Sequence, residues 1–331
     1  MTAPDALPIA ALLLVLAAVP LFASNVLLNF LFTALVVALA AQGWNLLGGF
    51  GGQFSFGQAA FFGTGAYAAA ALQIRLGVNA WAAAAIGVAA GAAVAWAIGF
   101  LAFRARLRGS YFALVTLAFA EVFRILANAS DVTGGAAGLL VRLDPRPANF
   151  QFESRAVFAW IAIACVGGVM VLCRVIERGR FGAQLVAVRE NEDAARALGV
   201  DALAIKLRAI TLSGAITAAA GCLYVQYFLL VNAEIGYGTW ISVEALLAAI
   251  VGGVGTVLGP VIGALALHGV GELTKGFASS ITGIDLVLFG LVLVLTTAFA
   301  PAGIVGSLAR LTRRRPPASA GGAPAPSTRT A

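Results

Sequence analysis

The sequence predicts an all-α integral membrane protein with about ten transmembrane or half-membrane helices. Of its 331 residues, 61% are hydrophobic and only 11% are charged, whereas soluble domains carry about 25% charged residues. No Asp, Glu, Lys or Arg occurs between Ala6 and Ile74, or between Leu76 and Phe103. Because a helix needs about 20 apolar residues to cross the hydrocarbon, the first of these runs has room for about three crossings.

Ten apolar segments are long enough to reach into or across a bilayer, and several are short or interrupted by glycine. They cover residues 8–23, 26–47, 55–74, 80–103, 110–128, 156–175, 209–230, 241–256, 257–274 and 284–300. We interpret the first as a retained helix and not a leader, because Asp5 is the only charge before it and no cleavage site of small residues is evident. Non-helical backbone at membrane depth is tolerated only where protein or a water-filled cavity satisfies it. We therefore expect the interruptions to lie inside the protein.

The basic residues predict which end of the bundle faces the cytoplasm. Most of them lie in the Arg104–Arg108 cluster, in residues 174–208, or in the tail from Arg310. Ten crossings put all three regions on one side, and short loops rich in Lys and Arg are typically cytoplasmic. Both termini are then cytoplasmic. The net charge of +7 is a topology signal on this interpretation, and we expect no nucleic-acid binding.

One domain and one tail are expected. Residues 1–309 form the transmembrane domain, with a cytoplasmic loop at about 176–208, and residues 310–331 form a basic and then disordered cytoplasmic tail. The end of that tail is rich in Pro, Ala and Ser, a composition that cannot bury a core. On the opposite side, the loop at about 129–155 is long enough to touch an external partner.

A short capped helix is predicted inside the cytoplasmic loop, at NEDAARALG. Asn191 can serve as the N-cap, Glu192 and Asp193 favour the positive end of the helix, and Gly199 supplies the left-handed residue that stops it. Three small or apolar residues are expected to share one face: Ala194, Ala195 and Leu198. Such a helix suits a groove in a partner protein, although it could also lie on the membrane surface.

Two glycine-rich stretches share a pattern. GGFG at 48–51 and GGVG at 252–255 are each followed by a further glycine, Gly57 or Gly259, and then by another apolar run. Transporters often contain internal repeats with interrupted helices at the substrate path. The match is short and the chain contains 39 glycines, so a true structural repeat remains open.

The capped segment resembles a known family. DAARALG, at 193–199, is similar to the EAA-x-x-x-G motif of bacterial ABC importer permeases, with Asp193 in the Glu position. Five further stretches resemble the branched-chain amino acid permeases of the LivM type: LGGFGGQFSFGQAAFFGTGAYAAAAL at 47–72, RLRGSYFALVTLAFAEVFR at 106–124, TGGAAGL at 133–139, GGVGTVLGPVIGA at 252–264 and FAPAGIVG at 299–306. Together, in this order, they specify the subtype better than any one alone.

The resemblance implies the ABC importer permease fold and a transport subunit that is not an enzyme. It implies a bacterial plasma membrane location and four kinds of partner: cytoplasmic ABC ATPase subunits that use ATP, a second permease subunit, a periplasmic or extracellular substrate-binding protein, and the lipid bilayer. It implies branched-chain or related amino acids as cargo. The ATPase-coupling residues would be Asn191, Glu192, Asp193, Ala194, Ala195, Leu198 and Gly199. The sequence contains no G-x-x-x-x-G-K-[ST], so ATP cannot bind this chain through a P-loop. We expect no cofactor, metal or catalytic residue in it.

Polar residues within the first glycine-rich stretch are candidates for the substrate path. A zwitterionic amino acid needs donors for its carboxylate and acceptors for its ammonium group, and interrupted helices provide both without a fixed charge. The candidate path residues are Gln53, Ser55, Gly57, Gln58, Thr116 and Glu121. Glu121 and Arg124 lie three apart, so they share a helix face and can pair. The alternative for the glycines is close helix packing by small residues.

Other functions remain open. Urea or simple-sugar permeases of the same superfamily carry the same coupling loop. An ion-coupled secondary transporter would need intramembrane carboxylates or a charged relay, and only Glu121 is expected to be deep. A membrane-embedded enzyme would need a nucleophile–base or metal constellation, which one histidine and scattered carboxylates do not offer.

Overall fold

Helices make up almost all of the structure. The computed structural model describes residues 3–278, 290 and 303–312. Its helices are α1 (Ala3–Phe22), α2 (Asn25–Trp44), α3 (Gln58–Leu76), α4 (Ala80–Arg104), α5 (Gly109–Ala129), α6 (Arg155–Arg178), α7 (Arg180–Glu190), α8 (Glu192–Ala197), α9 (Ala202–Phe228), α10 (Ala233–Tyr237), α11 (Thr239–Gly252), α12 (Gly259–Ala278) and α14 (Gly303–Thr312). The first nine predicted segments each contain a helix, while 284–300 lies outside the described residues except for Gly290. The prediction of an all-α membrane protein is confirmed.

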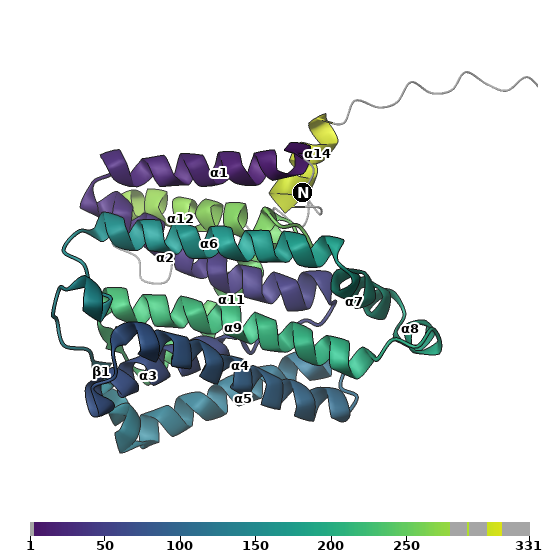
Figure 1. The fold of residues 1–331 in the computed structure, drawn as a ribbon, viewed down its shortest axis with the longest axis horizontal. Coiled ribbons are helices and arrows are strands. Elements are labelled where there is room, and N and C mark those ends of the chain that lie inside the picture. Colours follow the sequence, from purple (N-terminus) through teal and green to yellow (C-terminus); the bar gives the residue numbers. More distant parts are fainter. Residues whose placement is uncertain (1–2, 279–289, 291–302, 313–331) are drawn as a thin grey trace, which may run out of the picture.

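Six segments within the described residues are long and apolar enough to cross a membrane. They are Asn25–Phe50, Ala80–Arg104, Gly109–Ala129, Arg155–Arg178, Ala202–Phe228 and Ala233–Gly252. α1 contributes a shorter apolar helix, Leu7–Phe22. The chain is thus a multi-pass membrane protein whose spans lie side by side in one bundle (Figure 1).

The basic connections lie at one end of this bundle. Figure 1 shows the α4–α5 turn, α7, α8 and α14 at the end where the chain begins, with β1 at the opposite end. An ion pair of 3.1 Å between Arg108 and Glu192 joins the α4–α5 turn to α8. The predicted grouping of the basic regions is therefore seen for the described residues, while the side of the membrane stays a prediction.

Helices α3, α4 and α9 meet through glycines. A methyl group at Gly65 of α3 would overlap the backbone of Ala218 in α9, and one at Gly91 of α4 would overlap the side chain of the same residue. A methyl group at Gly214 of α9 would overlap Ala95 of α4. Membrane helices approach this closely where small residues remove side-chain bulk from the contact. The three helices therefore touch backbone to backbone.

Helix α2 lies inside the bundle and is apolar on nearly all sides. Leu35, Leu39 and Trp44 are fully buried in it, as expected of a helix surrounded by other helices. After Trp44 the helix continues as a π-helical turn, Asn45–Phe50, and the chain is then irregular until Gln58. The predicted interruption in the first glycine-rich stretch is thus present.

The predicted external loop is partly ordered by short elements. It contains three 3-10 turns (Asp131–Thr133, Gly135–Ala137 and Pro147–Asn149) and the strand β1 (Leu139–Leu140). β1 pairs antiparallel with β2 (Leu230–Val231), with Leu139 opposite Val231. This two-stranded ladder ties the loop to the end of α9.

The loop predicted to be cytoplasmic contains more helix than was expected. α7 was not foreseen as a separate helix, and α9 begins at Ala202, seven residues before the predicted segment at 209. Asp201 explains that early start, because its side-chain oxygen accepts a hydrogen bond of 3.0 Å from the Ala204 N–H and so caps the helix. The loop is a helical extension of the bundle.

Candidate coupling segment and substrate path

The short helix α8 has the predicted caps. The Asn191 side chain accepts a hydrogen bond of 2.9 Å from the Ala194 N–H. Gly199 adopts φ +84°, and the Val200 N–H closes the end by bonding to the Ala195 carbonyl at 3.0 Å. The N-cap at Asn191 and the left-handed glycine are confirmed.

The predicted common face of α8 is wrong in one residue. Ala195 is buried against the bundle, whereas Ala194 is exposed and Leu198 is 86% exposed. Ala195 lies about 60° from Leu198 around the helix, but Leu198 is at the C-cap, beyond the last helical residue, and its side chain is exposed instead of following Ala195 into the bundle. Asp193 is also exposed. Asp193, Ala194 and Leu198 are therefore among the residues that α8 exposes, and Ala195 is not.

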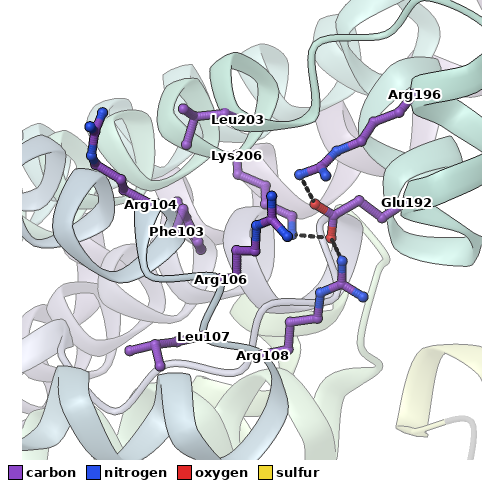
Figure 2. A pocket seen from close by; sticks show the side chains of 9 residues that line it. All are labelled: Phe103, Arg104, Arg106, Leu107, Arg108, Glu192, Arg196, Leu203 and Lys206. Atoms are coloured by element: carbon purple, nitrogen blue, oxygen red, sulfur yellow. Dashed lines mark hydrogen bonds and ion pairs between the residues drawn. The ribbon is translucent and has the colours of Figure 1, made fainter.

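Glu192 holds α8 to the bundle. Its carboxylate, 11% exposed, accepts a hydrogen bond of 2.7 Å from Lys206 of α9 and one of 2.6 Å from Arg196, and pairs with Arg108 (Figure 2). Burial alone raises the pKa of Glu192, but the Lys206 hydrogen bond and the charges of Lys206, Arg108 and Arg196 outweigh it and hold the pKa below its usual value. The sequence suggested only an interaction of Glu192 with the helix end.

Arg189 joins this segment to the first glycine-rich stretch. It lies near the end of α7, and its guanidinium donates a hydrogen bond of 3.0 Å to the Gly49 carbonyl. Its side chain also lies against Gly52, whose φ is +65° and where a methyl group would overlap it. Sequence reasoning used Arg189 only as a topology signal, because nothing local in the sequence indicates a contact 140 residues away.

Ser55, Gly57 and Thr116 are brought together. The Ser55 carbonyl accepts a hydrogen bond of 2.8 Å from the Trp44 indole N–H, and the Ser55 hydroxyl accepts one of 3.0 Å from the Gly57 N–H. The Thr116 hydroxyl accepts from the Phe56 N–H at 3.1 Å. All of these atoms are satisfied within the protein, so the three residues shape the irregular segment from its buried side.

The two glutamines differ in their surroundings. Gln58 is fully buried; its oxygen accepts a hydrogen bond of 2.7 Å from Thr217, and its nitrogen donates one of 3.3 Å to Ser213. Gln53 is half-buried, and its amide donates to the Gly51 carbonyl at 3.3 Å, within the same loop. Gln53 thus keeps polar atoms accessible, whereas Gln58 joins α3 to α9.

Glu121 lies further along α5. It pairs with Arg124 at 2.6 Å, as its spacing predicted, and Arg124 also reaches Glu234 of α10 at 3.3 Å. The Glu121 and Arg124 side chains are 43% and 31% exposed. Thr116 lies five residues earlier, more than one helical turn away. Glu121 is therefore not gathered with the other candidate path residues.

An apolar groove of about 440 Å³ lies between the first glycine-rich stretch and α5. Phe54 and Phe56 form one wall of it, and the first turns of α5 form the other: Gly109, Ser110, Ala113, Leu114 and Leu117. Phe54 and Leu114 are exposed. The walls of the groove are therefore apolar apart from Ser110, and Gln53 is not among the residues that line it.

A polar clamp that sequence reasoning missed joins the two glycine-rich stretches. The Asn45 side chain accepts a hydrogen bond of 2.7 Å from the Gly255 N–H and donates one of 2.9 Å to the Thr256 carbonyl. Gln42, one turn earlier on α2, donates to the Val257 carbonyl at 2.6 Å. A methyl group at Gly49 would come within 2.7 Å of the Gly255 N–H. The spacing of two amides three residues apart on an apolar helix was the available signal.

The two stretches that share a sequence pattern are thus packed against each other. In both, a membrane helix ends at glycines, the chain runs without regular helix for about six residues, and a new helix starts, at Gln58 or at Gly259. Within the described ranges, no three His, Cys, Asp or Glu side chains are grouped so that they could hold a metal ion.

The comparisons with known proteins agree with this architecture. A family model described as the permease component of branched-chain amino acid transport systems matches residues 26–297. The high-affinity branched-chain amino acid transport system permease protein LivM of Escherichia coli K12 is 28% identical over 331 residues, covering 92% of this chain and 76% of LivM. LivH of Salmonella typhimurium is 30% identical over 158 residues, covering 48% of this chain and 50% of LivH.

A shorter match comes from BraD of Pseudomonas aeruginosa, also a branched-chain amino acid transport permease by name. It is 32% identical over 134 residues, covering 40% of this chain and 41% of BraD. No solved structure matches the chain. Since the family model spans well over half of the residues, the chain belongs to the family of permease components of branched-chain amino acid transport systems.

Proposed function

We propose that the chain is the membrane-spanning permease subunit of an ATP-driven ABC importer that moves branched-chain amino acids into the cell. The observation that carries this proposal is the geometry of α8. This helix extends from one end of the bundle, is held on its inner side by Glu192, and exposes Leu198 on its outer side. A short helix presented in this way suits docking into a groove of a cytoplasmic subunit.

Energy then enters through a protein contact. ATP would be hydrolysed on separate ABC ATPase subunits, which is consistent with the absence of a P-loop motif from the sequence. Movement of α8 would reach α9 and the α4–α5 turn through Glu192, and the first glycine-rich stretch through Arg189. On this proposal, the end that carries α8, the start of α1 and α14 faces the cytoplasm of a bacterial plasma membrane.

Two further partners follow from the same proposal. A second, different permease would complete the path, a pairing supported by the fact that the chain is similar to both LivM and LivH. A periplasmic or extracellular binding protein would deliver the amino acid to the opposite end, where the ordered 130–154 loop lies.

The substrate path would run along the exposed side of α5. Among the six candidate spans, α5 is the least buried within the chain, so it is available to a second permease. The apolar groove formed with Phe54 and Phe56 suits the branched side chain of leucine, isoleucine or valine. Gln53, which precedes Phe54 in the chain and is half-buried, would offer a neutral hydrogen-bonding group to the polar end of the amino acid. Ser55, Gly57, Gln58 and Thr116 would support this lining from behind.

The test is purification of the tagged full-length chain from its native membranes in mild detergent. We expect a P-loop ATPase and a second permease to co-purify. Leu198→Asp should release the ATPase, because it places a charge on the outer face of α8. Leu143→Asp is the matched control, since Leu143 is similarly exposed in the loop at the opposite end. Retention of the ATPase by Leu198→Asp would contradict the docking assignment.

An uptake measurement separates this function from ion coupling. His268 of α12 and Glu244 of α11 are half-buried and lie 3.6 Å apart, and ionisable groups within membrane segments are a feature of proton-coupled transporters. We expect uptake of radiolabelled leucine to persist when an ionophore collapses the ion gradients and to stop when ATP is depleted. The opposite result would assign the chain to the ion-coupled class. Competition by urea or a simple sugar would identify a different cargo.

A further inference from the structure

A small basic pocket lies between the α4–α5 turn, α8 and the start of α9. Its volume is about 160 Å³. Five of its nine lining residues are cationic: Arg104, Arg106, Arg108, Arg196 and Lys206. Glu192 is the one acid in the lining, and Phe103, Leu107 and Leu203 complete it (Figure 2). The pocket therefore has a large excess of positive charge.

Glu192 neutralises only part of this charge. Its two oxygens are shared among Lys206, Arg196 and Arg108. Arg104 lies over the Phe100 ring, 5.7 Å from its centroid. In the part of the chain that the structure describes, no carboxylate forms an ion pair with Arg104 or Arg106. Lys206 is buried while the four arginines are exposed, and like charges gathered this closely repel each other unless an anion joins them.

The backbone at Arg106 is a second sign that the pocket serves a ligand. Helix α4 ends in a Schellman turn, in which the Arg106 N–H bonds to the Phe103 carbonyl at 3.0 Å and the Leu107 N–H bonds to the Ala102 carbonyl at 3.1 Å. Arg106 occupies the left-handed position of this turn with φ 56°. Glycine is favoured there because it has no Cβ. The turn alone gives no reason for arginine, whose side chain extends into the pocket beside Glu192 (Figure 2).

We propose that this pocket binds the phosphate group of an anionic membrane lipid. Guanidinium groups match phosphate oxygens in charge and geometry. A lipid is favoured over a soluble phosphate because the pocket lies where α4 and α5 leave the membrane-spanning bundle, the level at which headgroups lie. Leu101 and Tyr111, on these two helices, are exposed close to the same turn and offer apolar surface for acyl chains.

The bound phosphate would help to position α8. Arg108 and Arg196 hold Glu192 and would also face the phosphate, so occupancy would link the α4–α5 turn to α8 more firmly than Glu192 does alone. Anionic lipid would then adjust how α8 is presented to a docking subunit. The proposal does not depend on which solute is transported.

The experiment measures the melting temperature of the full-length chain, purified in mild detergent with whatever subunits it retains. Added phosphatidylglycerol should raise the melting temperature by about 5 °C near saturation, as a ligand that binds only the folded state does. Phosphatidylcholine should not, because its headgroup has no net charge. An equal rise with millimolar inorganic phosphate would assign the site to a soluble anion, and an equal rise with phosphatidylcholine would show that acyl chains cause the effect; either would overturn the proposal.

Arg106→Gly distinguishes an effect on lipid binding from an effect on the stability of the fold. It removes one cation but relaxes the backbone, so the melting temperature without lipid should not fall, while the rise with phosphatidylglycerol should be at least halved. Arg104→Gln gives a second variant with an unaltered turn. Arg180→Gln is the matched control, because Arg180 is exposed at the same end but does not line the pocket.

Three results would contradict the proposal. In the first, both pocket variants keep the full rise with phosphatidylglycerol. In the second, Arg180→Gln loses as much of the rise as Arg106→Gly, which would indicate general attraction of lipid to a basic end. In the third, Arg106→Gly releases a retained subunit while the lipid effect is unchanged, which would show that the pocket receives an acidic protein side chain instead.

Discussion

The Asn45 clamp gives a prediction whose magnitude can be worked out from its hydrogen bonds. Asn45→Ala removes the acceptor of the Gly255 N–H and the donor to the Thr256 carbonyl. A buried polar group left without a partner costs about 1–3 kcal/mol. Gly255 and Thr256 are half-buried, so we take the lower bound for each, which gives about 2 kcal/mol.

Such a loss corresponds to a fall in melting temperature of roughly 4–8 °C, measurable by size-exclusion chromatography of heated, detergent-solubilised protein. Asn45→Asp keeps an acceptor for the Gly255 N–H but places a carboxyl group in a fully buried site against the Thr256 carbonyl, so it should lose at least as much as Asn45→Ala. Gln53→Ala is the control, because the Gln53 hydrogen bond stays within its own loop, and it should change stability by less than about 0.5 kcal/mol. If Asn45→Ala melts within about 1 °C of the unaltered chain, the two stretches are held together by packing and the reasoning from hydrogen bonds is wrong.

Three further sets of substitutions test the coupling to ATP hydrolysis, the substrate path and the packing of the helices. Gly199→Val should reduce ATP-driven leucine uptake several-fold, because a β-branched residue in the left-handed conformation costs about 1–2 kcal/mol. Gly199→Asn should retain most of the uptake, since asparagine tolerates that conformation. Equal uptake by the two variants would show that Gly199 is not needed for coupling. Gln58→Leu should lower the free energy of unfolding by about 1–2 kcal/mol, because Gln58 packs α3 on α9. Gln53→Leu should lower leucine uptake and leave the melting temperature unchanged. The reverse pattern would show that Gln53 is the packing residue and Gln58 the path residue. The pKa of Glu192 is depressed, so the stability that its carboxylate contributes is complete above the ordinary carboxyl pKa and disappears as pH falls through the lower, folded-state pKa. Between about pH 5 and pH 3, Glu192→Gln should therefore lose less stability in melting curves than the unaltered chain does. Parallel losses in the two proteins would contradict the role of the carboxylate.

Local patterns predicted much of the fold. Apolar runs with few or no charged residues located the first nine membrane segments because hydrocarbon thickness sets helix length. Asn191 and Gly199 marked the ends of α8 because capping acts over three or four residues. The interruption after α2 was visible as a cluster of glycines. These features depend on near neighbours in sequence, and the structure confirms each of them.

The rest depended on distant partners. Gln58 has the composition expected of a path residue, but its bonds to Ser213 and Thr217 are set by how α3 packs on α9. The inward direction of Glu192 depends on Lys206 and Arg108, which belong to other elements. Arg189 and Asn45 were missed for the same reason, since their contacts join segments 140 and 210 residues apart.

The glycine contacts among α3, α4 and α9 restrict where the protein can move. Where Gly65, Gly91 and Gly214 meet their neighbours there is no room for a methyl group, so sliding one helix along another by a turn would drive an alanine into backbone. These three helices must therefore travel as one rigid unit. The change between inward and outward access would have to occur at contacts made by side chains, such as the Asn45 clamp and the Arg189–Gly49 hydrogen bond, which can break and re-form without unpacking backbone from backbone.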